Sequence, residues 1–316
     1  MNYPSRHNPG TWQVKTPFGI ARSHPATAVY QDKIYVFGGG GPAFKSLNSI
    51  EVYDPQSDTW TLRREMPSLR SGAMAITVGD KIYIMGGGFK KPDGKFRFLP
   101  TVEIYNPKTD TWESGPDMLR PHDYPAAAQL NGYIYIIGGH HPDATEGGPQ
   151  TDPGFSFCER FDSDKADWQE IAPLPPPRFA SAAVTYKGRI LTLGGVAFTP
   201  EGFKEYDCVE IYDPGQNLWA RSTDVVLPWS VAAHGACILK NQLYVLGGFS
   251  GEGGIGTHAG VYDFRSGTWR IIPPLPHSRA AMGVAIVDHT IYLIGGWSPD
   301  RSVMNSVVAY RPFPED

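Results

Sequence analysis

The sequence predicts an all-β fold, a six-bladed β-propeller in which four-stranded antiparallel blades stand around a central channel. Three observations lead to this fold. A double glycine ends a short apolar run six times, a tryptophan follows an aromatic residue at a fixed spacing in five of these repeats, and the tryptophan missing from the last repeat stands near the N-terminus. Recurrence at a fixed period indicates a repeat architecture.

Each double glycine follows a short run of β-branched and aromatic residues, and successive pairs are about 50 residues apart, a period found in propellers. The pairs are Gly38-Gly39, Gly87-Gly88, Gly138-Gly139, Gly194-Gly195, Gly247-Gly248 and Gly295-Gly296. The preceding runs, such as residues 33–37 and 133–137, are apolar at consecutive positions. Strands covered on both faces have this pattern, so each run predicts an inner strand of a blade.

Beyond each glycine pair lies an aromatic residue, and in five repeats a tryptophan stands seven residues after it. These pairs are Tyr53 and Trp60, Tyr105 and Trp112, Phe161 and Trp168, Tyr212 and Trp219, and Tyr262 and Trp269. Turn-forming Asp-Pro or Asn-Pro sequences between several of them predict a hairpin of two antiparallel strands. Because the rings recur with the repeat, we interpret them as packing between blades rather than as a ligand-stacking surface.

The sixth repeat has Tyr310 but no tryptophan after it, whereas Thr11-Trp12 precedes the first repeat and matches the Thr-Trp pairs of three others. We therefore expect the strand at about residues 11–15 to complete the sixth blade. Such closure removes the exposed strand edges that an open array would leave. The whole chain, residues 1–316, is then one propeller domain.

The double glycine with its spaced tyrosine and tryptophan resembles the kelch repeat, and the resemblance covers nearly the whole chain. It implies a stand-alone kelch-type propeller of six blades around a channel. Kelch propellers include protein-recognition modules, copper-radical oxidases of the galactose oxidase type and sugar mutarotases, so the resemblance assigns no chemistry. Those oxidases resemble seven-bladed rings with additional domains, and the six repeats here weigh against that activity.

Composition excludes several classes of function. The formal net charge is −4 and charged residues are spread along the chain, so no basic surface for nucleic acid is expected. No apolar run resembles a signal peptide or membrane span, and we expect a cytoplasmic protein without membrane contact. The three cysteines are widely spaced without a C-x-x-C motif, which argues against disulfides and a zinc site. No metal or cofactor is expected.

A basic residue recurs at the start of the first strand, and a glutamate recurs two residues before the aromatic residue. The basic residues are Arg22, Arg70, Arg120, Arg178 and Arg279, with Trp229 in the fifth blade, and the glutamates are Glu51, Glu103, Glu159 and Glu210. We expect ion pairs within each blade, because a buried guanidinium needs a carboxylate partner. Arg279 has Val308 where the others have glutamate, so it is the arginine expected to bind an anionic or carbonyl group.

The loops after the double glycines differ in length and are rich in aromatic residues, which predicts a functional site at the mouth of the ring. Residues that depart from the repeat are the ones free to serve a ligand. We expect ligand binding by Arg279, Trp229, Tyr124, His122, His140, Trp297, Phe249 and Phe198. His122, Asp123 and His140 lie in blade three, the blade richest in groups that transfer protons near neutral pH, and are the catalytic candidates.

Two functions from different classes fit these patterns. The first is recognition, in which the mouth binds a small organic ligand or a partner peptide or protein through the aromatic rim and the arginines. The alternative is a cofactor-independent enzyme, an isomerase, epimerase, mutarotase or cyclase, with its active site in the same mouth. A pocket of about 300–1,000 Å³ lined by aromatic residues would favour a small molecule, and a broad charged face would favour a protein. The oligomeric state is not predicted.

Overall fold

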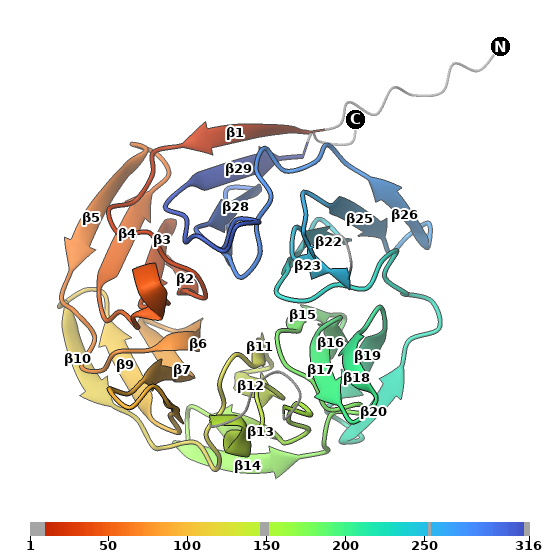
Figure 1. The fold of residues 1–316 in the computed structure, drawn as a ribbon, viewed down its shortest axis with the longest axis horizontal. Helices are drawn as coiled ribbons and strands as arrows, with labels where there is room; N and C mark the ends of the chain where they lie inside the picture. The colour runs from red at the N-terminus through yellow and green to blue at the C-terminus, as the bar shows by residue number, and fades with distance from the viewer. Residues whose placement is uncertain (1–9, 146–151, 252–253, 313–316) are drawn as a thin grey trace.

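The computed structural model describes residues 10–145, 152–251 and 254–312, and within them six antiparallel blades, each with four main strands, stand around a central axis (Figure 1). The chain runs around the ring from the red N-terminal strand to the blue C-terminal strand. This confirms the predicted six-bladed, all-β propeller. No described helix is long and apolar enough to cross a membrane.

The first three blades are each built from consecutive segments of the chain. Blade one contains β2 (Ala26–Tyr30), β3 (Lys33–Phe37), β4 (Ile50–Asp54) and β5 (Thr59–Arg63), with the short helix η1 (Pro42–Phe44) in its loop. Blade two contains β6 (Ser71–Val78), β7 (Lys81–Lys90), β9 (Val102–Asn106) and β10 (Thr111–Ser114), and β8 (Phe96–Phe98) pairs with β7. Blade three contains β11 (Ala126–Leu130), β12 (Tyr133–Ile137), β13 (Cys158–Asp162) and β14 (Asp167–Ile171), with η2 (Pro142–Thr145) in its loop.

The last three blades repeat the plan, with extra hairpins in two loops. Blade four contains β15 (Ala182–Tyr186), β16 (Arg189–Leu193), β19 (Val209–Asp213) and β20 (Leu218–Arg221), with the hairpin β17 (Val196–Thr199) and β18 (Gly202–Glu205). Blade five contains β21 (Gly235–Leu239), β22 (Gln242–Leu246), β25 (Ala259–Asp263) and β26 (Thr268–Ile271), with β23 (Phe249–Ser250) and β24 (Gly254–Ile255). Blade six contains β27 (Gly283–Val287), β28 (Thr290–Ile294), β29 (Val307–Arg311) and the N-terminal β1 (Thr11–Lys15).

The N-terminal strand closes the ring as predicted. Strand β1 pairs antiparallel with β29, and Trp12 lies opposite Tyr310 with their ring centroids 4.9 Å apart. Figure 1 shows the red β1 beside the blue β29. The first and last parts of the chain thus form one blade.

The repeated tryptophans connect neighbouring blades. In every blade the indole Nε1–H donates a hydrogen bond of 2.8–3.3 Å to a main-chain carbonyl. The acceptor lies in the segment that connects the preceding blade to the blade of the tryptophan. The pairs are Trp12 to Pro273, Trp60 to Thr16, Trp112 to Arg64, Trp168 to Pro116, Trp219 to Ala172 and Trp269 to Val226. This confirms the interpretation of these rings as packing between blades.

The second glycine of each pair makes a further bond between blades. Its N–H donates a hydrogen bond of 2.7–3.1 Å to a carbonyl at the start of the next blade. The pairs are Gly39 to Arg70, Gly87 to His122, Gly139 to Arg178, Gly195 to Val231, Gly248 to Arg279 and Gly296 to Arg22. We call the acceptor residue the ring position of its blade. In blade two the donor is Gly87, so the structural pair is Gly86-Gly87, one residue earlier than predicted.

A closed circle of backbone hydrogen bonds surrounds the axis two residues beyond the ring position. Each member donates its N–H to the carbonyl of the member in the preceding blade, over 2.7–3.3 Å. The members are His24, Gly72, Tyr124, Ala180, Ala233 and Ala281, and all have positive φ. Positive φ is uncommon for residues other than glycine. The circle holds the His24 and Tyr124 side chains at the centre of the ring.

Candidate functional site

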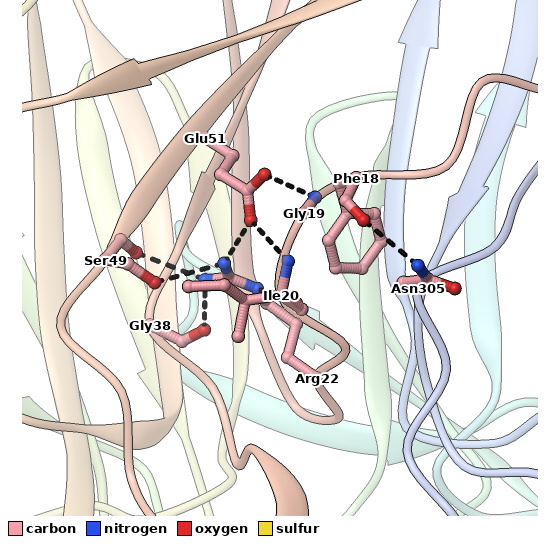
Figure 2. Close-up of polar contacts among 8 residues, drawn as sticks. All are labelled: Phe18, Gly19, Ile20, Arg22, Gly38, Ser49, Glu51 and Asn305. Carbon is pink, nitrogen blue, oxygen red and sulfur yellow. Dashed lines mark hydrogen bonds and ion pairs between the residues drawn. The ribbon is translucent and has the colours of Figure 1, made fainter.

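Arg22 is the clearest of the predicted same-blade ion pairs, and Figure 2 shows its surroundings. Its guanidinium is fully buried, and Nη2 lies 2.6 Å from Glu51 Oε1. Nη1 donates to the Gly38 carbonyl at 2.8 Å, while the Glu51 carboxylate accepts from the main-chain N–H of Gly19 at 2.7 Å. The pair is therefore part of the scaffold.

Blade two confirms the same arrangement. Arg70 Nη2 lies 3.1 Å from Glu103 Oε1, and Nη1 donates to the Gly86 carbonyl at 3.0 Å. The Arg70 side chain is buried. Both arginines neutralise a buried carboxylate and leave no charge for a ligand.

In blade three the predicted pair of Arg120 and Glu159 is wrong. The ring position is His122, which is fully buried, with Nε2 3.0 Å from Glu159 Oε1 and Nδ1 2.6 Å from the Gly138 carbonyl oxygen. Arg120 stands two residues earlier, with its guanidinium carbon 5.9 Å from the Phe157 ring centroid. His122 thus does in this blade what arginine does in the others, and the structure places it in the scaffold rather than in the mouth.

Blade four also departs from the prediction. Arg178 Nη1 contacts Cys208 Sγ at 3.0 Å, and Glu210 forms its ion pair with Arg221 at 2.8 Å. Cys208 is thus the partner of Arg178, and Glu210 pairs instead with Arg221 on the outer strand β20 of the same blade. The predicted pairing of the glutamate with Arg22, Arg70, Arg120 or Arg178 of its own blade therefore holds in blades one and two only.

The expected convergence of Arg279 and Trp229 on the mouth is wrong. Arg279 is fully buried and donates to the Gly295 and Ser306 carbonyls at 3.3 Å, and burial lowers its pKa to about 10. Trp229 packs 5.3 Å from the His258 ring, two residues before the ring position of blade five. Both side chains lie in the body of their blades.

The mouth does contain a cavity, with a volume of about 490 Å³. Its walls are aromatic side chains from the loops of five blades. They are Phe44, Phe96, Phe98, Tyr124, Phe179, Phe198 and Trp297. Tyr124, His140, Trp297 and Phe198 among the predicted ligand residues line this cavity, as does the catalytic candidate Asp123. Phe249 does not line it and instead lies 5.9 Å from the Phe203 ring.

One histidine and two carboxylates lie close together in the cavity wall. His140 Nδ1 makes a short hydrogen bond with Asp152 Oδ2, and His140 Nε2 lies 3.9 Å from Asp123 Oδ2. The His140 ring stacks on Phe179 with centroids 4.0 Å apart. Asp152 Oδ1 accepts from the main-chain N–H groups of His141 and Gly154, both at 3.1 Å. We call Asp123, His140 and Asp152 the mouth triad.

The surroundings shift the pKa of each member of the mouth triad. Burial raises the pKa of Asp123 to about 7, with His140 opposing and Asp152 adding to the shift. Burial opposes the charged form of Asp152, but the hydrogen bond from His140 holds its pKa below the usual value. Burial disfavours the charged form of His140, but its hydrogen bond with Asp152 and the charge of Asp123 raise its pKa overall. Asp152 is therefore the member that stays ionised at neutral pH, whereas Asp123 changes charge near pH 7.

His24 is a cavity residue that the sequence patterns did not single out. Its ring lies between Tyr124 and Trp297, with both centroids 4.4 Å away, and burial lowers its pKa to about 3. It occupies the same place in blade one as Tyr124 in blade three. A comparison of the six members of the backbone circle would have identified it, since four of them are glycine or alanine.

Two charged residues of the lining were not among the predicted ligand residues. They are Asp152, in the long loop of blade three, and Lys90, at the end of β7. Glu146, in the same long loop as Asp152, lies outside the described residues. A second, smaller cavity of about 240 Å³ lies between the inner strands and is lined mostly by small residues. The backbone circle lies between the two.

The model of the Attractin/LZTR1 β-propeller family matches residues 7–254 of the sequence. The chain belongs to this family of kelch-type propellers. Kelch-like protein 36 of Bos taurus is 27% identical over 249 residues, 76% of this chain and 38% of that protein. Kelch-like protein terF of Aspergillus terreus is 28% identical over 252 residues, 76% of this chain and 52% of that protein. The chain thus spans about half or less of these relatives.

The solved structure of YjhT has the same architecture. It aligns with a TM-score of 0.77 and covers 93% of this kelch propeller and 96% of YjhT, at 20% sequence identity. A likeness at this identity shows the fold alone. Kelch propellers generally mediate protein binding, and neither the family match nor the relatives specify what binds in this mouth.

Proposed function

We propose that this kelch propeller binds a small organic molecule with an apolar ring system in the cavity at its mouth. The observation that carries the proposal is the cavity of about 490 Å³, walled by aromatic side chains around the mouth triad. Sites for small molecules have about this volume, and they combine apolar walls with a few placed polar groups. Phe179 and Trp297, from blades four and six, are among the aromatic side chains of this wall.

The distribution of charge supports a small molecule over an acidic peptide. Arg279, the arginine expected to bind an anionic group, is buried among main-chain carbonyls, and Arg22 and Arg70 are buried against glutamates. Lys90 is the basic side chain besides the histidines that the described structure places in the cavity wall. Recognition in the mouth therefore rests on aromatic contact and on Asp123 and His140.

We expect Trp297→Ala to weaken the binding of 1-indanol, a small ring-bearing alcohol, by about threefold to tenfold, because an aromatic stacking partner is removed. The measurement is a titration followed by ligand-detected NMR, with thermal unfolding recorded for each variant. Phe249→Ala is the matched control. Phe249 occupies the same bridge position in blade five that Trp297 occupies in blade six, and it does not line the cavity.

Equal losses of affinity in the two variants would contradict a site at this wall. The absence of saturable 1-indanol binding to the unmodified protein would overturn the proposal as a whole, and a peptide or protein partner would then be the better explanation of the mouth. Unchanged binding in Phe249→Ala with a clear loss in Trp297→Ala is the expected result.

The mouth triad also favours a second candidate, a cofactor-independent enzyme that transfers protons, as isomerases and epimerases do. A carboxyl group with a pKa of about 7 can give and take a proton at neutral pH. With 1-indanone, a base would remove a proton from C2 while the carbonyl oxygen gains one, and reversal in D₂O would leave deuterium at C2. Faster deuterium incorporation with the unmodified protein than with Asp123→Asn supports this candidate, and equal rates contradict it.

A further inference from the structure

The two inward-facing members of the mouth triad are close to each other but do not bond. His140 Nε2 and Asp123 Oδ2 are 3.9 Å apart, which exceeds the reach of a hydrogen bond. The Asp123 side chain is only 14% exposed, yet it borders the cavity. An oxygen atom about 2.8 Å from each of two groups at this spacing would make a good hydrogen bond with both.

The third member fixes how His140 presents its second nitrogen. Asp152 holds an ionised carboxylate, since its pKa is lowered, and a carboxylate only accepts hydrogen bonds. His140 Nδ1 must therefore carry the proton that is donated to Asp152. Stacking on Phe179 holds the plane of the ring, so that Nε2 is the atom left to face Asp123.

We propose that Asp123 and His140 together bind one carbonyl or hydroxyl oxygen on the apolar ligand of the mouth cavity. This inference rests on the proposed function and specifies the ligand class, an uncharged ring compound that carries an oxygen. Asp123 Oδ2 and His140 Nε2 are the two contacting atoms. The aromatic wall would hold the ring system beside them.

Protonation of Asp123 decides which oxygen binds best. Below about pH 7, Asp123 is protonated and donates, as does protonated His140, and a carbonyl oxygen can accept from both. Above about pH 7, Asp123 is ionised and accepts only. A carbonyl then loses Asp123 as a donor, whereas a hydroxyl donates to the ionised Asp123 and also accepts from His140 as long as Nε2 of that ring is protonated.

The other titratable groups facing the mouth triad do not reproduce this switch. The pKa of His24 is lowered to about 3, the pKa of Tyr124 is raised, and the pKa of Asp152 is lowered, so none of the three changes charge between about pH 6 and 8. His140, Lys90 and His141 also lie nearby, and substitution of Asp123 separates its contribution from theirs.

The test compares three probes of nearly equal size, indane, 1-indanol and 1-indanone, by ligand-detected NMR titration at pH 6 and pH 8. At pH 6 we expect both oxygenated probes to bind about threefold to tenfold more tightly than indane, the value of a typical hydrogen bond. At pH 8 the advantage of 1-indanone should fall, while that of 1-indanol should persist.

Asp123→Asn should reduce the pH dependence of 1-indanone binding, because asparagine does not titrate in this range and His140 remains as the titrating contact. Asp143→Asn is the control, since that carboxylate is 92% exposed on η2 and does not line the cavity. Equal binding of all three probes at both pH values would overturn the oxygen site and leave the apolar cavity intact. No binding of any probe would overturn both. A pH dependence of unchanged size in Asp123→Asn would assign the titration to another group and contradict the inference.

Discussion

Replacing Trp12 by alanine should lower the free energy of unfolding by about 3 kcal/mol, the lower end of the range for truncating a large aromatic side chain, because Trp12 is only partly buried. Its ring packs on Tyr310, and its indole N–H bonds the Pro273 carbonyl at 2.8 Å. Both contacts hold the N-terminal strand to segments near the end of the chain. The measurement is equilibrium unfolding in urea.

Gln13→Ala tests the same strand at an exposed position and should change stability by less than about 0.5 kcal/mol. A loss as small as this in Trp12→Ala would mean that closure of the sixth blade contributes little to stability. Trp60→Ala offers a comparison inside one continuous segment, since Trp60 makes the equivalent contact with Tyr53 at 4.9 Å.

Substituting Glu51 by glutamine should cost about 3–5 kcal/mol of stability, because it leaves the buried Arg22 guanidinium without its counter-charge. The main-chain N–H groups of Gly19 and Ile20 also lose a charged acceptor. Urea unfolding at pH 7 measures the effect. The double variant Arg22→Met with Glu51→Leu should recover much of the loss, since it removes both charges together.

Glu210→Gln is the matched control for this substitution. Glu210 holds the same repeat position in blade four, but its partner is Arg221, whose side chain is 59% exposed. Water can solvate that arginine after the substitution, so we expect a loss of about 1 kcal/mol or less. Similar losses in the two variants would contradict the distinction between a buried pair and a surface-facing pair.

The fold could be predicted from sequence because its signals repeat. The glycine pairs and tryptophans each satisfy the same backbone requirement in every blade, and the missing tryptophan of the sixth repeat identified Trp12 as its replacement. Blade two is an exception, because three glycines follow one another there. The predicted pair, Gly87-Gly88, is only one residue away from the observed pair, Gly86-Gly87.

The candidate site was predicted only in part, for two physical reasons. Arginine identity was taken as the marker of the ring position, whereas the structure defines that position by a carbonyl that accepts from the preceding blade. The predicted ring positions of blades three and five, Arg120 and Trp229, therefore lie two residues before the observed ones, His122 and Val231. For the same reason His122 was predicted to lie in the mouth. The contact of Asp152 with His140 depends on the path of a long loop, which no repeat specifies.

The aromatic wall was easier to predict than the polar contacts within it. Tyr124 and Trp297 depart from the residues at equivalent places in other blades, and both line the cavity. Arg279 departs from its repeat too, but serine and main-chain carbonyls replace the absent glutamate as its partners. A break in a repeat therefore indicates a functional residue only when no scaffold contact explains it.

The most direct test of a ligand site in the mouth is a crystal structure of the protein soaked with 1-indanone at pH 6. We predict that the ring will lie against the aromatic wall, with the carbonyl oxygen within about 3.2 Å of both Asp123 and His140. A ring bound in the cavity with its oxygen turned to solvent would contradict the oxygen site. A mouth that stays empty of 1-indanone at saturating concentration would contradict small-molecule binding itself.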